Sequence, residues 1–440
     1  MTVRSYLFSF QTILLAIAIM LRITFTRLSL FLLIPLSTSF GQDVDSMGRS
    51  LVNQYLVSTN GDERENIIKA LDGLQFNFTQ LKDWVNGSAH YTSQQPGLHR
   101  ELVSVGDKKG EYFVYVPSSY RIDRAWPVVL ALHGVGGSGY GQIMTWLKSS
   151  AHNDEFIFIT PTYGSGLWWN EEAERLVLSV FDKVKQDYHI DTNRVYLTGF
   201  SSGGHGVWYF ALRYPSLFAA INPIAAECLL PYFLVNLEHV PVYIIHGTRD
   251  SVIPVEAARD ASSRLEKLNY TVVYKELSEQ KHQFPVNEIA KVLDWFRMHK
   301  RTLYPKRIKF STESTGYSFS YWIEITGFSE LIGQVSGVSR DIAGRLVRPQ
   351  GFSETATVVA EIKEEDNEVC LTTHEVNSVR LFLDEDLIDM ERPLRVSING
   401  KEVYCEKVRR SVQTTLDTVK KRNDQEALFS VCLDLCVPSD

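Results

Sequence analysis

Residues 194–210 read RVYLTGFSSGGHGVWYF, and this stretch decides the fold that we predict. It contains a G-x-S-x-G pattern, Gly199 to Gly203, between an apolar strand and a helix-forming run of small and apolar residues. In that context the chain makes a sharp turn that lifts one serine hydroxyl out of the sheet, and the flanking glycines leave room for the turn. A simple Gly/Ser-rich connection is the alternative in a chain with 27 glycines. The pattern predicts that Ser201 is a nucleophile.

A serine nucleophile needs a histidine base and a carboxylate that orients the base. Asp250 lies in VYIIHGTRDSVIP, residues 242–254, where an apolar strand ends in a turn. It could instead cap a helix that begins near Val255. His282 follows the next predicted strand, 271–277, and precedes a predicted helix. We expect Asp250 to be the acid and His282 the base.

Three other histidines compete for the position of the base. His299 falls at the end of the predicted helix 286–298, where a histidine favours the helix dipole. His189 lies in a turn, and His246 lies on the strand that precedes Asp250. We predict structural roles for all three.

A developing oxyanion needs backbone N–H donors, one after the nucleophile and one after an earlier strand. Residues 127–139 read PVVLALHGVGGSG, an apolar strand that breaks into a glycine-rich loop. The N–H groups of Ser202 and Val135 are the candidates, with Gly134 as a substitute. The loop lacks the Lys-Ser/Thr pair of a phosphate loop and the glycine spacing of a dinucleotide site. We expect no cofactor and no metal.

The central part of the chain is similar to a known group of enzymes. The matching stretches are residues 112–117, 132–134, 190–201, 214–220 and 246–250. They resemble the secreted esterases of the poly(3-hydroxybutyrate) depolymerase and feruloyl esterase group, and the phospholipase/carboxylesterase group, all of them α/β-hydrolases. The resemblance implies an α/β fold with a mostly parallel sheet flanked by helices. It also implies that Ser201, Asp250 and His282 fill the nucleophile, acid and base positions.

With 440 residues the chain is longer than one average domain. Residues 42–97 have a helical pattern, which we interpret as an extension packed on a catalytic domain at 98–305. Residues 311–440 change to the two-residue period of strands, and Asn399-Gly400 predicts a hairpin turn. This part is expected to be an antiparallel, sandwich-like accessory domain. The strands that we predict in it are residues 317–325, 356–362, 378–383, 394–398 and 428–435, with one helix at 411–422.

Residues 1–41 have the pattern of a signal peptide. From Met20, the basic residues Arg22 and Arg27 precede an apolar run, 28–36, and small residues follow it. We infer that Met20 is the true start and that the protein is secreted or periplasmic. An N-terminal membrane anchor is the alternative, although the two apolar runs, 12–21 and 28–36, are both shorter than the roughly 20 residues of a membrane span.

The composition argues against a nucleic-acid partner and does not decide whether the cysteines form disulfides. The formal charge of −7 comes without a basic stripe, so we expect no nucleic-acid binding. The five cysteines are Cys228, Cys370, Cys405, Cys432 and Cys436, and export would permit a bridge among the last four. Cys432 and Cys436 are expected to share one face of a strand as small core residues.

Together these features predict a serine hydrolase of carboxylic esters, polymeric or not. Short-chain, hydroxyalkanoate, and feruloyl or acetyl esters on polysaccharide all fit. Trp168 and Trp169 follow a strand, where loops line the crevice of an open α/β sheet, so at least one is expected to contact substrate. One of them could instead fill the core. A prolyl-oligopeptidase-like peptidase and a non-catalytic binding scaffold on the same fold remain the alternatives.

Overall fold

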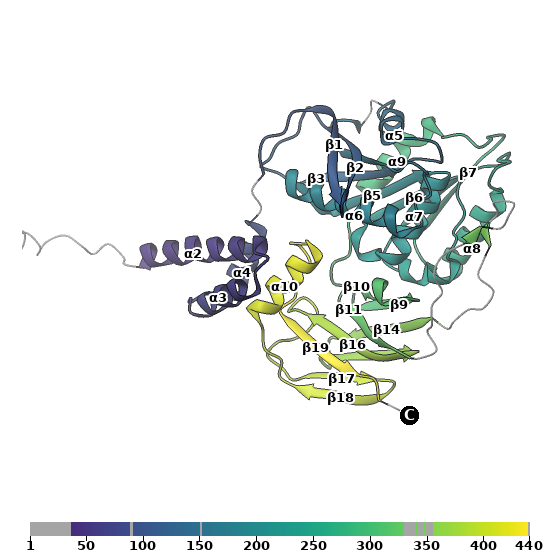
Figure 1. Cartoon of the computed structure of the whole chain (residues 1–440). Helices are drawn as coiled ribbons and strands as arrows, with labels where there is room; N and C mark the ends of the chain where they lie inside the picture. Colours follow the sequence, from purple (N-terminus) through teal and green to yellow (C-terminus); the bar gives the residue numbers. More distant parts are fainter. Residues whose placement is uncertain are drawn as a thin grey trace, which may run out of the picture.

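The computed structural model describes residues 37–88, 91–149, 152–329, 339–340, 346–347 and 355–438 (Figure 1). Most of the predicted signal segment, 1–41, lies outside the described residues. The described residues form a large sheet with helices on both faces, a group of helices near the N-terminus, and, toward the C-terminus, a five-stranded, a four-stranded and a two-stranded sheet. Among the described residues, no helix has the length and hydropathy needed to cross a membrane.

The large sheet has eight strands in the order β1-β2-β4-β3-β5-β6-β7-β8. Strand β2 pairs antiparallel with both β1 and β4, and all pairs from β4 to β8 are parallel. This is the mostly parallel sheet that the sequence predicts. The strands are β1 Gly97–Val105, β2 Lys108–Val116, β3 Trp126–Leu132, β4 Ile157–Thr162, β5 Ile190–Phe200, β6 Ala220–Ile224, β7 Val242–Gly247 and β8 Val272–Leu277.

Strand β3 shows how the sheet is buried on both faces. Val128 and Leu130 belong to the core that includes residues of α6, α7 and α8, whereas Val129 and Ala131 belong to the core that includes residues of α5 and α9. Such a strand is apolar at every position, as expected for a parallel sheet covered by helices. The helices are α5 Gly139–Trp146, α6 Glu171–Asp187, α7 Ser202–Arg213, α8 Val255–Lys267 and α9 Ile289–Arg297, with 3₁₀ turns η2 Pro215–Leu217, η3 Pro231–Leu237 and η4 Val286–Glu288.

Three helices precede the sheet: α2 Ser37–Val57, α3 Gly61–Asp72 and α4 Phe78–Asn86. Asn60 accepts two backbone N–H groups at the start of α3, and Asn77 forms a capping box with Gln80 at the start of α4. Their apolar residues share a core with α10, Val412–Arg422, of the C-terminal part. The extension therefore packs on α10, whereas the sequence led us to expect the large sheet as its main partner.

The C-terminal part contains two sheets around one core, in the orders β18-β17-β15-β14-β9 and β10-β11-β16-β19. Strands β15 and β17 pair in parallel, so the predicted antiparallel arrangement is not complete. The first strand, β9, begins at Arg307, before the predicted boundary at 311, and β15 was not predicted. The elements are β9 Arg307–Thr312, η5 Thr315–Tyr317, β10 Phe319–Ser320, β11 Ile323–Phe328, β12 Ser339–Arg340, β13 Leu346–Val347, β14 Ala356–Lys363, β15 Glu368–His374, β16 Val376–Leu383, β17 Leu394–Ile398, β18 Lys401–Glu406 and β19 Val431–Cys436.

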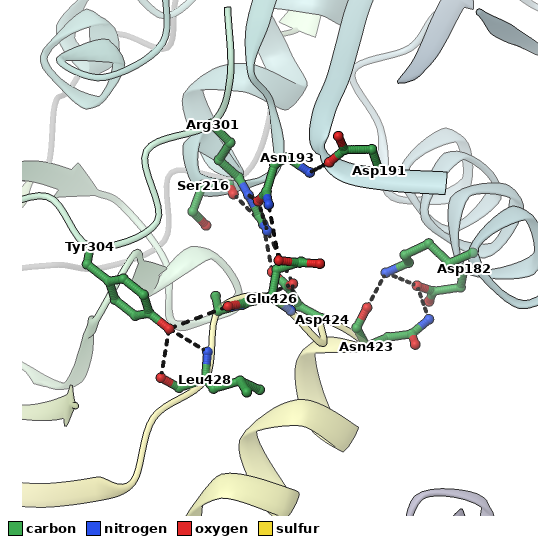
Figure 2. A network of polar contacts seen from close by, with 12 residues as sticks. Asp182, Asp191, Asn193, Ser216, Arg301, Tyr304, Asn423, Asp424, Glu426 and Leu428 are labelled. Atoms are coloured by element: carbon green, nitrogen blue, oxygen red, sulfur yellow. Dashed lines mark hydrogen bonds and ion pairs between the residues drawn. The ribbon is translucent and has the colours of Figure 1, made fainter. Parts of the chain in front are cut away.

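Buried polar contacts join the large sheet to the C-terminal part (Figure 2). Arg301, which follows α9, donates to both carboxylate oxygens of Asp424, in the loop between α10 and β19. The same guanidinium donates to the carbonyl of Ser216 and the side-chain oxygen of Asn193. Tyr304 binds both the N–H and the carbonyl of Leu428. The segment between α9 and β9 is therefore a packed interface.

The cysteines of β19 correct one expectation. Cys432 and Cys436 do share a face of the strand, but they are exposed, because Val431 and Leu435 supply the buried positions. All five cysteines are free thiols. The period of two was predicted correctly, whereas the assignment of these two residues to the core was wrong.

Candidate active site

Ser201 occupies a sharp turn between β5 and α7. Its φ of 58° and ψ of −123° lie outside the usual regions for a side-chain-bearing residue. A Cβ at Gly199 would lie 2.3 Å from the carbonyl oxygen of Gly203, and a Cβ at Gly203 would lie 2.1 Å from that of Leu132. Both glycines are therefore required by close backbone approaches. The strand, turn and helix match the sequence prediction.

Three predicted side chains meet at this turn. The hydroxyl oxygen of Ser201 lies 2.8 Å from Nε2 of His282, and Nδ1 of His282 lies 2.7 Å from Oδ2 of Asp250. The Asp250 side chain is fully buried, whereas the His282 side chain is 16% exposed. His282 comes from the loop between β8 and η4, and its ring packs against Phe200. The three residues form one continuous hydrogen-bonded chain.

Asp250 is held by the turn that follows β7. Its Oδ1 accepts the N–H groups of Val252 and Ile253, both at 2.9 Å, so it closes a local turn and does not cap α8. Burial opposes ionisation of the Asp250 carboxyl, but the N–H groups of Ile253 and Val252, together with His282, hold its pKa below the ordinary value. An ionised carboxylate is the form that can orient the His282 ring and stabilise an imidazolium.

The glycine-rich loop after β3 lies beside Ser201. A Cβ at Gly134 would lie 3.5 Å from the Cβ of Ser201, and the Val135 side chain is exposed. Ser202 is the first residue of α7, where backbone N–H groups lack helical partners. The predicted donors Ser202, Val135 and Gly134 thus belong to segments that adjoin the hydroxyl; their role as an oxyanion hole stays a prediction.

His133 orders this loop, and the sequence analysis did not assign it a role. The N–H of Tyr163 donates to Nε2 of His133 at 3.1 Å, so Nδ1 carries the hydrogen that binds the carbonyl of Gly134 at 2.7 Å. Burial lowers the pKa of His133, which favours this neutral form. The only sequence signal was its position directly before Gly134.

The comparisons with known proteins agree with this architecture. Residues 170–300 match the model of the phospholipase/carboxylesterase family, and this match includes all three residues of the hydrogen-bonded chain. The fold is that of an α/β-hydrolase.

Curated proteins similar to this chain are esterases and a depolymerase. The chain is 30% identical over 145 residues to a bifunctional acetylxylan esterase/xylanase of Neocallimastix patriciarum, covering 32% of the chain and 21% of the relative. It is 31% identical to feruloyl esterase B of Thermothelomyces thermophilus, and the match covers 28% of the chain and 46% of that relative. It is 29% identical to poly(3-hydroxyalkanoate) depolymerase C of Paucimonas lemoignei, and the match covers 26% of the chain and 31% of that relative. The chain thus spans less than half the length of each of these three relatives.

The two tryptophans after β4 differ in their surroundings. Trp168 is completely buried in the hydrolase core, and its Nε1 donates to the carbonyl of His133 at 2.7 Å. The predicted substrate contact is therefore wrong for Trp168. Its side chain instead packs in the core and is hydrogen-bonded to His133, at the start of the glycine-rich loop. Trp169 is partly buried, stacks edge-on against His205, and lines a small apolar hollow beside α7.

The three competing histidines make contacts away from Ser201. His299 follows α9 and packs on Trp295, and His189 binds the carbonyl of Ile122. His246 is fully buried in β7 and lies close to Asp250, 3.5 Å from its Oδ2. Of the four histidines considered for the base, only His282 has a ring nitrogen within hydrogen-bond distance of Ser201.

Proposed function

We propose that this protein hydrolyses carboxylic esters through an acyl-enzyme on Ser201. The observation that carries the proposal is the hydrogen-bonded chain from Ser201 through His282 to Asp250, with distances of 2.8 and 2.7 Å. A serine hydroxyl becomes a useful nucleophile only when a base of this kind receives its proton.

In the proposed reaction, the hydroxyl oxygen of Ser201 attacks the ester carbonyl carbon while Nε2 of His282 takes the hydroxyl proton. The C–O bond to the leaving alcohol then breaks, and His282 returns the proton to that alcohol. A water molecule attacks the acyl-enzyme by the same route and releases the acid and free Ser201. Asp250 keeps Nδ1–H of His282 in place and stabilises its positive charge.

The charge on the tetrahedral intermediate falls on the former carbonyl oxygen. We assign its stabilisation to the backbone N–H groups of Ser202 and Val135, with Gly134 as the alternative to Val135. A donor that is already in place before the reaction costs no reorganisation when the charge forms.

The relatives narrow the proposed substrates without selecting one. They are named as acting on acetylxylan, feruloyl esters and poly(3-hydroxyalkanoate). We therefore assign to this chain the hydrolysis of short acyl, feruloyl or hydroxyalkanoate esters. Trp169 is the proposed substrate contact, since an indole face stacks well on a flat acyl group or a sugar ring.

The test uses the full chain and two kinds of substrate. Hydrolysis of p-nitrophenyl acetate and butyrate, together with labelling of Ser201 by a fluorophosphonate, is the expected result. Cleavage of a proline p-nitroanilide in place of the esters would indicate a peptidase, and absence of both activities and of labelling would indicate a scaffold. Methyl ferulate, acetylated xylan and hydroxybutyrate oligomers then rank the natural classes.

The division into a catalytic domain, 98–305, with helical and β-rich additions is part of this proposal, as is export of the protein. The N-terminal residue of the mature protein tests export. A mature chain that begins after residue 36 supports a cleaved signal peptide, whereas a chain that retains Met1 or Met20 in a membrane fraction supports an anchor.

A further inference from the structure

His246 is the second residue from the end of β7 and lies underneath the Asp250 turn. Its side chain and that of Asp250 are both fully buried. The Nε2 atom of His246 lies 2.9 Å from the carbonyl oxygen of Ile253 and 3.5 Å from Oδ2 of Asp250. One ring nitrogen therefore contacts both ends of the turn that carries the acid.

The hydrogen-bond pattern assigns the proton of this ring. A carbonyl oxygen can only accept, so Nε2 of His246 carries a hydrogen. Nδ1 of His246 is buried and has no hydrogen-bond partner among the described residues. The Nε2–H group of His246 is therefore a donor directed at the turn.

The carboxylate of Asp250 is hydrogen-bonded to the proposed base and lies close to the His246 ring, whose Nε2–H donates to Ile253. Oδ1 of Asp250 is occupied by the N–H groups of Val252 and Ile253. Oδ2 accepts from Nδ1 of His282 at 2.7 Å and lies next to Nε2–H of His246. Rotation of the carboxylate away from His282 would break the Oδ1 bonds and take Oδ2 off the His246 donor.

We propose that His246 is a positioning residue that holds the Asp250 turn and directs Oδ2 of Asp250 toward His282. This role rests on the proposed function, because it acts through the acid of the triad. The structure gives a physical reason for a histidine at this point of the strand: an imidazole is rigid, is long enough to reach Ile253 from β7, and supplies a donor there.

The test compares three variants of the full chain. His246→Leu removes the donor at similar volume, His246→Gln keeps an amide donor near the position of Nε2, and His246→Asn carries an amide that is too short to reach. We expect His246→Leu and His246→Asn to lower kcat about tenfold or more with little change in KM, and His246→Gln to recover most of the loss. If the Leu variant does not fold, the comparison of Gln with Asn decides.

A double-mutant cycle separates positioning from general damage. In an Asp250→Asn background, His246→Leu should add less than about a twofold further loss, because the carboxylate through which it acts is already absent. His299→Leu is the control, since it alters a half-buried histidine that packs on Trp295; its effect, if any, should be the same in both backgrounds.

Different results overturn different claims. If the wild-type chain does not hydrolyse the esters, the proposed function is wrong; if it does and Asp250→Asn leaves turnover unchanged, Asp250 is not the acid and the positioning role is wrong with it. If Asp250→Asn abolishes turnover while folded His246→Leu and His246→Asn retain the wild-type kcat, only the positioning role is wrong. A loss from His246→Leu that is undiminished in the Asp250→Asn background, or one that Gln does not relieve, also overturns the positioning role.

Discussion

Arg301 and Asp424 form a two-pronged ion pair between the hydrolase sheet and the C-terminal sheets. Nη1 of Arg301 lies 2.6 Å from Oδ2 of Asp424, and Nη2 lies 3.2 Å from Oδ1. The side chains are only 3% and 7% exposed. A pair this deeply buried is costly to break from one side, because the remaining group stays buried without its main counter-charge.

Replacement of Arg301 by methionine should therefore lower the free energy of unfolding by about 3–5 kcal/mol. The double variant Arg301→Met with Asp424→Leu should recover part of that loss, because the Asp424 carboxylate is no longer buried without the Arg301 guanidinium. Chemical denaturation measures both.

The matched control for this prediction is Arg259→Met. Arg259 also makes two bonds to a carboxylate, Glu276, but its side chain is 48% exposed. We expect a loss of no more than about 1 kcal/mol there. Equal losses for the two arginines would contradict the importance that we give to burial.

Asp424 should also make stability depend on pH. Burial raises its pKa, but Arg301, Arg422 and the N–H group of Glu426 together have the opposite and larger effect, so the pKa in the folded protein is well below the ordinary 3.8. The ionised pair then stabilises the fold fully above pH 3.8, and this contribution is lost as the pH falls below that value. Unfolding measured between pH 5 and 3 should show a steeper loss in the wild type than in Asp424→Asn. Equal slopes would contradict the prediction.

Ser201→Ala should abolish ester hydrolysis, with a loss of roughly 10⁴-fold or more. The hydroxyl contributes little to packing, so the melting temperature should stay close to that of the wild type. Combining Ser201→Ala with His282→Ala should cost scarcely more than either change alone, because the residues act as one unit. A Ser201→Ala variant that kept a tenth of the activity would rule out the proposed nucleophile.

His282→Ala should cause a similar loss, whereas His299→Ala should not affect turnover directly. His299 packs on Trp295 at the end of α9, so its replacement is expected to affect stability and not kcat. Steady-state kinetics on p-nitrophenyl acetate, together with melting curves, distinguish the two. Retention of activity in His282→Ala and its loss in folded His299→Ala would reverse the assignment of the base.

The adjacent tryptophans should respond differently to truncation. Trp168→Ala removes a completely buried side chain and should cost about 3–5 kcal/mol of stability. Trp169→Ala should raise KM for methyl ferulate more than for p-nitrophenyl acetate, at a smaller cost in stability. If neither KM changes, Trp169 does not contact the acyl group.

The elements around Ser201 were predictable because each has a local cause. The strand, the glycines and the helix start are contiguous, and their spacing restricts the backbone to one turn. Asp250 and His282 could be placed because each follows a strand, and parallel strands end at the same edge of the sheet. The sequence thus predicted which residues meet, although their distances came only from the structure.

Other features depend on contacts that a single segment does not reveal. Trp168 and Trp169 are the same residue type in the same loop, so the sequence cannot tell which one is buried. Only the packing of Trp168 against His133 decides this. For Cys432 and Cys436, alternation predicted a shared face but not which face is covered by the second sheet. Strand β15 is short and contains several polar residues, so its sequence alone did not mark it as a strand. Its pairing with β14 and β17 shows that it is one.

The buried connection between α9 and β9 has a consequence for how the protein could meet a large substrate. An enzyme whose accessory module hangs on a flexible tether can search a surface around its point of attachment. Here Arg301 and Tyr304 lie inside the interface, so nothing in this segment acts as a tether. The C-terminal sheets are therefore held at one fixed distance and orientation from Ser201, and a polymer that contacted both parts would have to span that fixed distance.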